Sequence, residues 1–316
     1  AAGGNYILFG FRPEHAPSAT RVLTEGQKPL FRLPVSAHAA ALGGDNVSLI
    51  EDDETMIFHN PALLSSVTDK TINLNYMSYM SGVNTASASF NRVVKERASW
   101  AVSGQYLDYG KMKEVNESNV QTGEFSARDI SMAGYFSYML TNHIAGGISA
   151  KLISSFIGDY SSVAFGVDLG LNYFDDKHQW SVSMVAKNLG GQLKAYDEEY
   201  DKMPLDVQIG VSKAFANVPL RLHLTWVDIN HPKYKFINHL VVGADFQLSD
   251  QIWIGGGYNF RRANEMKIQS TDGKSSNGAG LSLGGGLNLN RFKLNIAYAK
   301  YHVSSSSLLF NVSYVL

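Results

Sequence analysis

From Thr71 to the end of the chain, apolar and polar residues alternate with a period of two in one short segment after another. In one such segment, Leu240, Val242 and Phe246 alternate with Gly243 and Asp245. Successive side chains of a β-strand point to opposite faces of its sheet, so the pattern predicts strands with one apolar and one polar face. A helix would need a period near 3.6. The pattern therefore favours an all-β fold.

The alternation and the turn-forming residues between segments divide this region into about fourteen strands. We expect strands at 71–80, 84–93, 98–109, 127–139, 143–154, 161–173, 179–188, 205–215, 219–229, 238–248, 251–262, 278–290, 292–301 and 306–316. Many are close to the length of about 9–11 residues that a tilted strand needs to cross a membrane.

The connections between the expected strands alternate between short and long. Short ones are expected at 140–142, 174–178, 216–218, 249–250 and 290–291, and long ones at 110–126, 189–204, 229–237 and 262–277. Outer-membrane barrels have short periplasmic turns and longer outward loops. The amphipathic last segment, Ser307–Leu316, can close such a sheet against its first strand. We therefore predict an antiparallel transmembrane β-barrel over residues 71–316, with a soluble antiparallel sandwich as the alternative.

Residues 1–70 differ from the predicted barrel wall. They contain five of the eight prolines, and proline is confined to the edges and bulges of sheets. A short helix is predicted over Ser36–Leu42, with Ser36 as its N-cap and Gly43-Gly44 ending it. We expect residues 1–70 to form a plug or periplasmic segment. The acidic run Glu51–Glu54 is interpreted as a solvated charge run, with a Ca²⁺ site as the alternative.

Composition argues against several other classes of protein. No run of 18 or more apolar residues occurs, which argues against a transmembrane helix. The chain has no cysteine, and its net charge of −1 would not attract nucleic acid. No arrangement of residues fixes a catalytic nucleophile, and the histidines are scattered. We therefore predict no enzymatic activity, no metal site and no cofactor, and leave bound lipid or lipopolysaccharide open.

Two groups of residues are candidate functional sites. The motif Asn60-Pro61-Ala62 is interpreted as a turn that leads into the wall, or as a constriction that gates the lumen. Charged and aromatic residues of the long loops are candidate partner contacts, with plain solvated loop as the alternative. These loop residues are Tyr196, Asp197, Glu198, Glu199, Tyr200, Arg261, Arg262 and Lys267.

Aromatic residues gather near the expected strand ends, where they are predicted to form a girdle at the membrane interface. They are Tyr76, Tyr79, Tyr106, Tyr109, Tyr135, Tyr138, Tyr173, Tyr298, Tyr301 and Trp180. Glycine runs inside alternating segments, such as 255–257 and 284–286, are interpreted as bulges, kinks or close approaches of the plug to the wall.

Several motifs resemble the PorQ family of outer-membrane proteins. They are residues 33–44 (LPVSAHAAALGG), 60–64 (NPALL), Asn75-Tyr76, 104–110 (GQYLDYG), 122–125 (TGEF) with Asp129, 187–194 (KNLGGQLK) and 204–213 (PLDVQIGVSK). The similarity covers most of the chain from Leu33 onward, whereas residues 11–31 look like an insertion. The Asn-Pro-Ala element is shared with FadL-type fatty-acid transporters.

The resemblance implies a FadL-like barrel of fourteen strands in the bacterial outer membrane, and we expect the chain to be a mature form with its signal peptide removed. It also implies a place in the attachment complex of the type IX secretion system. There the barrel would anchor a PorZ-like surface protein beside the sortase PorU and the cargo shuttle PorV, with catalysis left to the sortase. The alternative hypothesis is a FadL-like transporter of a hydrophobic small molecule.

Overall fold

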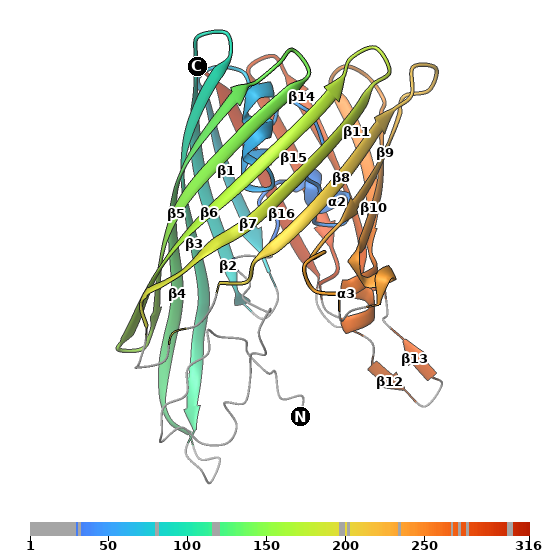
Figure 1. The fold of residues 1–316 in the computed structure, drawn as a ribbon. Helices are drawn as coiled ribbons and strands as arrows, with labels where there is room; N and C mark the ends of the chain where they lie inside the picture. The colour runs from blue at the N-terminus through green and yellow to red at the C-terminus, as the bar shows by residue number, and fades with distance from the viewer. Residues whose placement is uncertain are drawn as a thin grey trace.

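The structure, a computed structural model, describes Leu30 and residues 33–79, 82–115, 121–195, 200, 203–232, 235–266, 268–270, 273–275, 278–301 and 306–316. Within these residues, fourteen antiparallel strands form one closed barrel (Figure 1). The first and last strands pair from Thr71 opposite Val315 to Ser78 opposite Leu308. The predicted fold class, strand number and closure are confirmed.

In chain order, the wall strands are β1 (Thr71–Ser78), β2 (Asn84–Val94), β3 (Ala98–Val115), β4 (Gln121–Met139), β5 (Ile144–Ile157), β6 (Tyr160–Asp175), β7 (Trp180–Lys194), β8 (Asp206–Ala214), β9 (Leu220–Trp226), β10 (Leu240–Gln247), β11 (Ile252–Asn259), β14 (Leu281–Leu289), β15 (Phe292–Ala299) and β16 (Ser307–Val315). Each pairs with its neighbour in sequence, except that β11 pairs with β14. The chain between β11 and β14 forms α3 (Phe260–Glu265) and the small hairpin β12 (Ile268–Ser270) and β13 (Gly273–Ser275). A further 3₁₀ turn, η5 (Phe236–His239), precedes β10.

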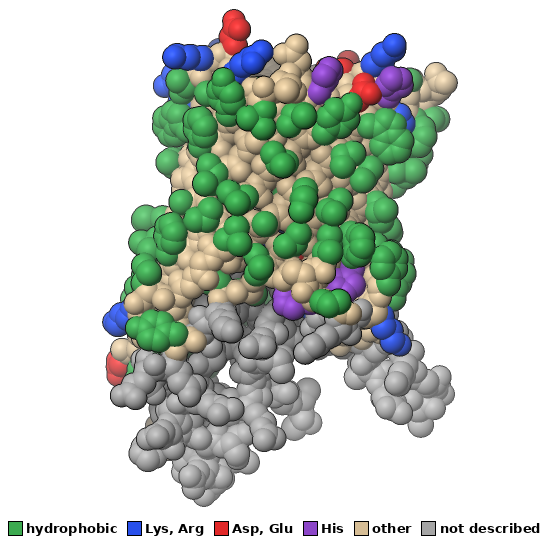
Figure 2. Space-filling model, in the orientation of Figure 1, with side chains coloured by type: hydrophobic (Ala, Val, Ile, Leu, Met, Phe, Trp, Pro, Cys, Tyr) green, Lys and Arg blue, Asp and Glu red, His purple; other side chains and the backbone are tan. Residues whose placement is uncertain are grey.

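The alternation in the sequence separates an apolar outer face from a polar lumen. Along β1, Ile72, Leu74 and Tyr76 are exposed, whereas Asn73 and Asn75 are buried. Figure 2 shows apolar side chains spread over the wall, with charged side chains gathered toward its ends. Lipid would cover such an apolar band and remove it from water.

The two ends of the barrel differ, but not everywhere as predicted (Figure 1). The expected long loop 110–126 is mostly strand, because β3 continues to Val115 and β4 already begins at Gln121. This hairpin extends past its neighbours, since pairing with β2 ends at Asp108 and pairing with β5 ends at Ala127. A register shift lies between Asp108 and Lys111. β7 likewise continues to Lys194 into the expected loop 189–204, and β5 and β6 are joined by only Gly158 and Asp159.

Residues 33–67, here called the lumen segment, lie inside the barrel (Figure 1). They contain α2 (Ala37–Ala41), η2 (Glu54–Phe58) and η3 (Pro61–Ser66). As expected, Ser36 caps α2, its Oγ accepting a hydrogen bond from the Ala39 N–H at 3.1 Å. α2 packs against β11, β14, β15 and β16, while η3 packs against β3, β4, β5 and β6. The lumen segment therefore touches walls on both sides of the barrel.

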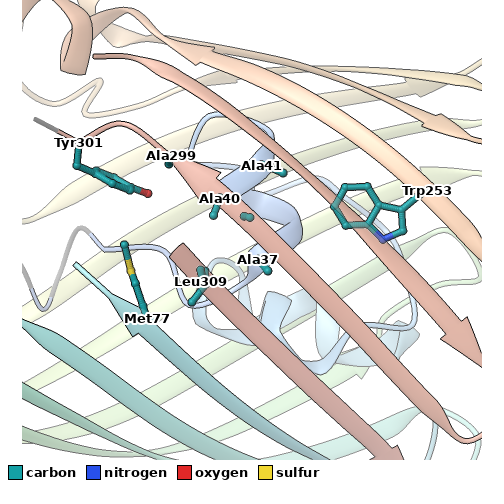
Figure 3. Packing of buried hydrophobic residues seen from close by; sticks show 9 residues of the cluster. Ala37, Ala40, Ala41, Met77, Trp253, Ala299, Tyr301 and Leu309 are labelled. Carbon is teal, nitrogen blue, oxygen red and sulfur yellow. The ribbon is translucent and has the colours of Figure 1, made fainter. Parts of the chain in front are cut away.

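Small residues let α2 pack tightly against the wall. Ala37, Ala40 and Ala41 form a buried cluster with Trp253 and Leu309 (Figure 3). Alanine leaves the helix narrow at this face, and burial of these side chains favours the folded state without loss of side-chain entropy.

Candidate functional site

Glycines of the wall receive the end of α2. A Cβ atom added to Gly257 would lie 2.1 Å from the carbonyl carbon of Leu42, and one added to Gly243 would lie 2.9 Å from the Leu42 Cβ. These distances are too short for any side chain, so the chain after α2 rests directly on the backbones of β10 and β11. For Gly257, the interpretation as a close approach of the N-terminal segment is confirmed.

The motif Asn60-Pro61-Ala62 docks on the other side of the lumen. The Asn60 Oδ1 accepts a hydrogen bond from the Ala62 N–H at 2.9 Å and thereby caps η3. A Cβ added to Gly147 would lie 2.3 Å from the Ala62 nitrogen, and one added to Gly170 would lie 2.1 Å from the Asn60 Oδ1. The motif is therefore a helix cap held against the lumen faces of β5 and β6. It is not a simple turn into β1, because η3 follows it.

A network of five charged or ionisable side chains joins the lumen segment to the wall. At its centre, the Asp245 carboxylate accepts hydrogen bonds from Arg221 Nε at 2.8 Å, His223 Nε2 at 3.0 Å and His38 Nε2 at 3.1 Å. The Glu51 Oε2 lies 2.7 Å from His38 Nδ1 and 3.7 Å from Arg221 Nη2. We call these five residues the Asp245 network.

The network holds a protonated histidine inside the barrel. The His38 and Asp245 side chains are both 0% exposed. Burial alone would lower the pKa of His38, but the carboxylates of Glu51 and Asp245 outweigh it and raise this pKa to about 9. Burial would raise the pKa of Glu51, but His38 and Arg221 lower it to about 2. His38 and Arg221 therefore balance the two carboxylates, as a buried ionic cluster requires.

An aromatic ring covers the histidine. The indole of Trp253 stacks on the His38 imidazole with ring centroids 3.5 Å apart and planes 5° from parallel. The Trp253 Nε1–H donates to the Asn295 Oδ1 at 3.1 Å, which fixes the indole. A cation over an indole face is stabilised by the ring quadrupole, so Trp253 favours the protonated form of His38.

The interpretation of Glu51–Glu54 as a solvated charge run is wrong. Asp53 and Glu54 are buried, Glu51 belongs to the Asp245 network, and burial raises the pKa of Glu54 to about 8. The run points into the lumen because it belongs to the lumen segment. Among the described residues, no group of three or more histidine, aspartate or glutamate side chains is placed to hold a metal ion.

Arg262 is not the surface contact that its loop position suggested. Its side chain is buried, donates to the Gly280 carbonyl at 2.9 Å and lies 4.4 Å over the Tyr301 ring. The predicted partner contact is therefore wrong for Arg262. Arg261 is paired with Asp228 and Glu265, while Tyr200 is 65% exposed. Residues 196–199 and Lys267 lie outside the described residues.

The predicted aromatic girdle is only partly correct. Tyr106 and Tyr138 are exposed, but Tyr109 and Tyr135 are buried and face the lumen. Residues three apart on a strand point to opposite faces, so both tyrosines of such a pair cannot reach the lipid. The same spacing separates Tyr298, which is exposed, from Tyr301, which is buried.

One serine lies in the sequence motif of a hydrolase nucleophile but not in the backbone conformation that such a nucleophile needs. Gly280, Ser282 and Gly284 fit the pattern G-x-S-x-G. Ser282 lies within β14, is buried, and its Oγ accepts a hydrogen bond from Arg262 Nη2 at 2.7 Å. A hydrolase serine instead sits on a sharp turn from a strand into a helix. The position of Ser282 therefore supports a structural role.

Two cavities lined by described residues of the lumen are both small. One, beside Asn75 and Met77, has a volume of about 10 Å³, and another, against β5, β6 and β7, has a volume of about 60 Å³. Pockets for drug-sized ligands are typically ~300–1,000 Å³. Neither cavity is large enough for such a ligand.

No helix among the described residues is long and apolar enough to span a membrane. No family model matches the sequence, and no curated protein matches it. The structure is similar to that of the Pseudomonas putida toluene transporter TodX, with a TM-score of 0.59 and 12% identity over 89% of this chain and 98% of that one.

Two further solved structures are similar. A Pseudomonas aeruginosa FadL homologue gives a TM-score of 0.55 at 11% identity, covering 88% of this chain and 97% of that one. The monoaromatic hydrocarbon channel CymD gives 0.56 at 11% identity, covering 89% and 96%. At these identities the likeness concerns the fold alone. The chain therefore has the closed barrel fold of these FadL-like proteins.

Proposed function

We propose that the chain is a non-enzymatic barrel of the bacterial outer membrane that serves as a closed support for a partner at the cell surface. The observation that carries this proposal is the attachment of the lumen segment to both walls. The Asp245 network fixes it on one side, and the contacts of Asn60-Pro61-Ala62 with Gly147 and Gly170 fix it on the other. A barrel filled in this way suits anchoring better than passage.

The mechanism of such a support is tethering. A barrel confines its partner to the membrane and replaces a bimolecular encounter with a high effective concentration. Loops on a rigid wall are suited to present the contact surface. The resemblance to the PorQ family supports a PorZ-like surface protein as the partner, next to the sortase PorU and the cargo shuttle PorV of a type IX secretion system.

Passage of a hydrophobic small molecule is the second candidate function. The comparisons favour it over anchoring, because TodX is a toluene transporter and CymD a monoaromatic hydrocarbon channel. For this chain, neither of the two small cavities, of about 10 and 60 Å³, would hold such a compound, so we expect transport to require movement of the lumen segment. Movement would break the buried pairs of the Asp245 network.

Uptake into vesicles separates the two candidates. The purified barrel is reconstituted in lipid vesicles, and entry of labelled toluene and of a labelled fatty acid is compared with entry into protein-free vesicles. The proposal predicts that each compound enters vesicles with the barrel at the same rate as it enters protein-free vesicles. A clearly faster rate with the barrel, saturable with concentration, would make transport the better account.

A further inference from the structure

A β-bulge in β7 turns two neighbouring polar side chains into the lumen. The pairing with β6 passes from Val167 opposite Leu189 to Leu169 opposite Ala186, so that Asp168 faces both Lys187 and Asn188. Asn188 has a φ of 63°, and both Lys187 and Asn188 are buried. In a regular strand one of two consecutive residues would face the lipid. A bulge is a common means of redirecting a side chain toward a site.

These two side chains line the cavity of about 60 Å³, together with His59 of the lumen segment and Lys151 of β5. His59 is 4% exposed, and neither of its ring nitrogens has a hydrogen-bond partner. Burial lowers the pKa of His59, and the nearby charge of Lys187 lowers it further. The ring is therefore neutral and has one N–H to donate. A buried polar group without a partner in a native fold calls for an explanation such as a bound ligand.

Among the charged groups that line the cavity, Lys187 has no direct partner in the part of the chain that the structure describes. Lys151 lies 2.8 Å from Asp168 and donates to the Asn188 Oδ1 at 2.6 Å, so Asp168 is already paired. The second carboxylate of the lining, Asp45, has an interaction of its own. Lys187 is 9% exposed, and its ammonium group forms no ion pair or hydrogen bond with any residue in the described ranges. Asp168 is near enough to interact with Lys187 through its charge, but a buried ammonium group without a direct hydrogen-bond partner is still costly.

We propose that this cavity binds a small oxyanion of the phosphate or carboxylate class between Lys187 and His59. Lys187 supplies the charge, and both groups donate charge-assisted hydrogen bonds to the anion. A water needs ~10–15 Å³ of such space, so the cavity of about 60 Å³ holds roughly four to six water-sized groups, close to the size of a phosphate or an acetate. The site does not depend on whether the barrel anchors a partner or passes a small molecule.

The oxyanion has two sources with the same chemistry, a free ion and the head group of a lipid. Phe58, Leu33 and Val35 also line the cavity and give it one apolar side. Inorganic phosphate, acetate and a short-chain phosphatidic acid are therefore the probes. Binding of phosphatidic acid about tenfold tighter than phosphate would indicate a lipid head group, and equal or weaker binding would indicate a free ion.

Titration calorimetry of the full chain in a nonionic detergent tests the site. The buffer contains chloride but no phosphate or carboxylate. We expect at least one of the three probes to bind with a stoichiometry near one. Absence of binding by all three at millimolar concentration would overturn the proposal.

Variants locate the bound ion. Lys187→Met should weaken binding by about tenfold or more, because it removes a charged hydrogen-bond donor. His59→Phe keeps an aromatic ring but removes both ring nitrogens, and it should also weaken binding. This second variant tests the site even if Lys187→Met fails to fold. Lys177→Met removes an equal charge from an exposed turn and should bind like the unmodified chain. Unchanged binding by a folded Lys187→Met or His59→Phe barrel would contradict the assignment.

Discussion

Single side chains decide how firmly the lumen segment is held. Asp245 accepts three hydrogen bonds and is 0% exposed, so every partner it loses leaves a buried charge less well compensated. No local sequence signal indicates this network. His38 lies in an alanine-rich helix and its partner Asp245 is 207 residues away in the chain. Only the closure of the barrel brings them together.

Replacement of Asp245 by asparagine should destabilise the folded barrel by about 3–5 kcal/mol, because it removes one partner of a buried ionic cluster. Thermal unfolding in detergent, followed by circular dichroism, measures the change. Asp176→Asn removes the same charge from an exposed turn and should change stability by less than about 1 kcal/mol. Equal stability of the two variants would show that the network contributes nothing.

The contacts of the Asp245 network, which attach the lumen segment to the wall, should weaken at alkaline pH. The folded pKa of His38 is about 9, above the ordinary value of 6.5, so its stabilisation is complete below pH 6.5 and is lost as pH rises through 9. This shift corresponds to about 3 kcal/mol. Glu51 has a lowered pKa of about 2, so its contribution is present above pH 4.5 and is lost as pH falls through 2.

Amide hydrogen exchange of residues 37–64 at pH 7 and pH 10, corrected for the intrinsic rate, measures this loss. Protection should fall between the two values in the unmodified chain. His38→Gln should show the lower protection already at pH 7 and little further change. A fall of the same size in His38→Gln would assign the effect to other groups.

Strands follow from local alternation, which is why their positions could be predicted from the sequence alone. The side that each residue faces could also be predicted within a regular strand. The alternation would place Asn188 on the lipid side, and this is wrong because β7 has a bulge there. Strand length was also underestimated, as in β3 and β4. A bulge inserts one extra residue into a strand and so interrupts the alternation. In the sequence, this interruption looks the same as the end of a strand.

Glycines of the wall should control the position of the lumen segment. Gly257→Val places a branched side chain where Leu42 now lies, and should destabilise the fold by about 1–3 kcal/mol. Limited proteolysis should then cut the lumen segment faster. Gly104→Val is the control, because a Cβ at Gly104 meets nothing within 4 Å. Resistance to proteolysis equal to that of the control would contradict the close contact.

At the level of the whole molecule, closure into fourteen strands was predictable because alternation, strand length and an amphipathic last strand agree with one another. Function was not predictable to the same degree. The fold is shared with transporters, and the contacts that fill the lumen arise only in three dimensions. The side chains inside such a barrel, and not the number of its strands, decide whether a molecule can pass through it.

Removal of residues 196–202, between β7 and β8, should release a surface partner and leave the barrel folded. Lys194 ends β7 and Met203 packs in a buried cluster with Ile153 and Ala164, so the deletion spares both. Co-purification of the partner with the variant measures retention. As a control, a variant with the turn at 216–218 replaced should retain the partner. Full retention by the loop variant would exclude this loop as the contact.

The most direct test of the account is isolation of the barrel from its native outer membrane after crosslinking, with the captured proteins identified by mass spectrometry. The proposal predicts large surface proteins crosslinked to lysines at the outward strand ends and loops, such as Lys194 at the end of β7 and Lys202 or Lys267 in the loops. A barrel that is recovered alone, carrying only a fatty acid or another hydrophobic compound, would contradict anchoring and favour transport.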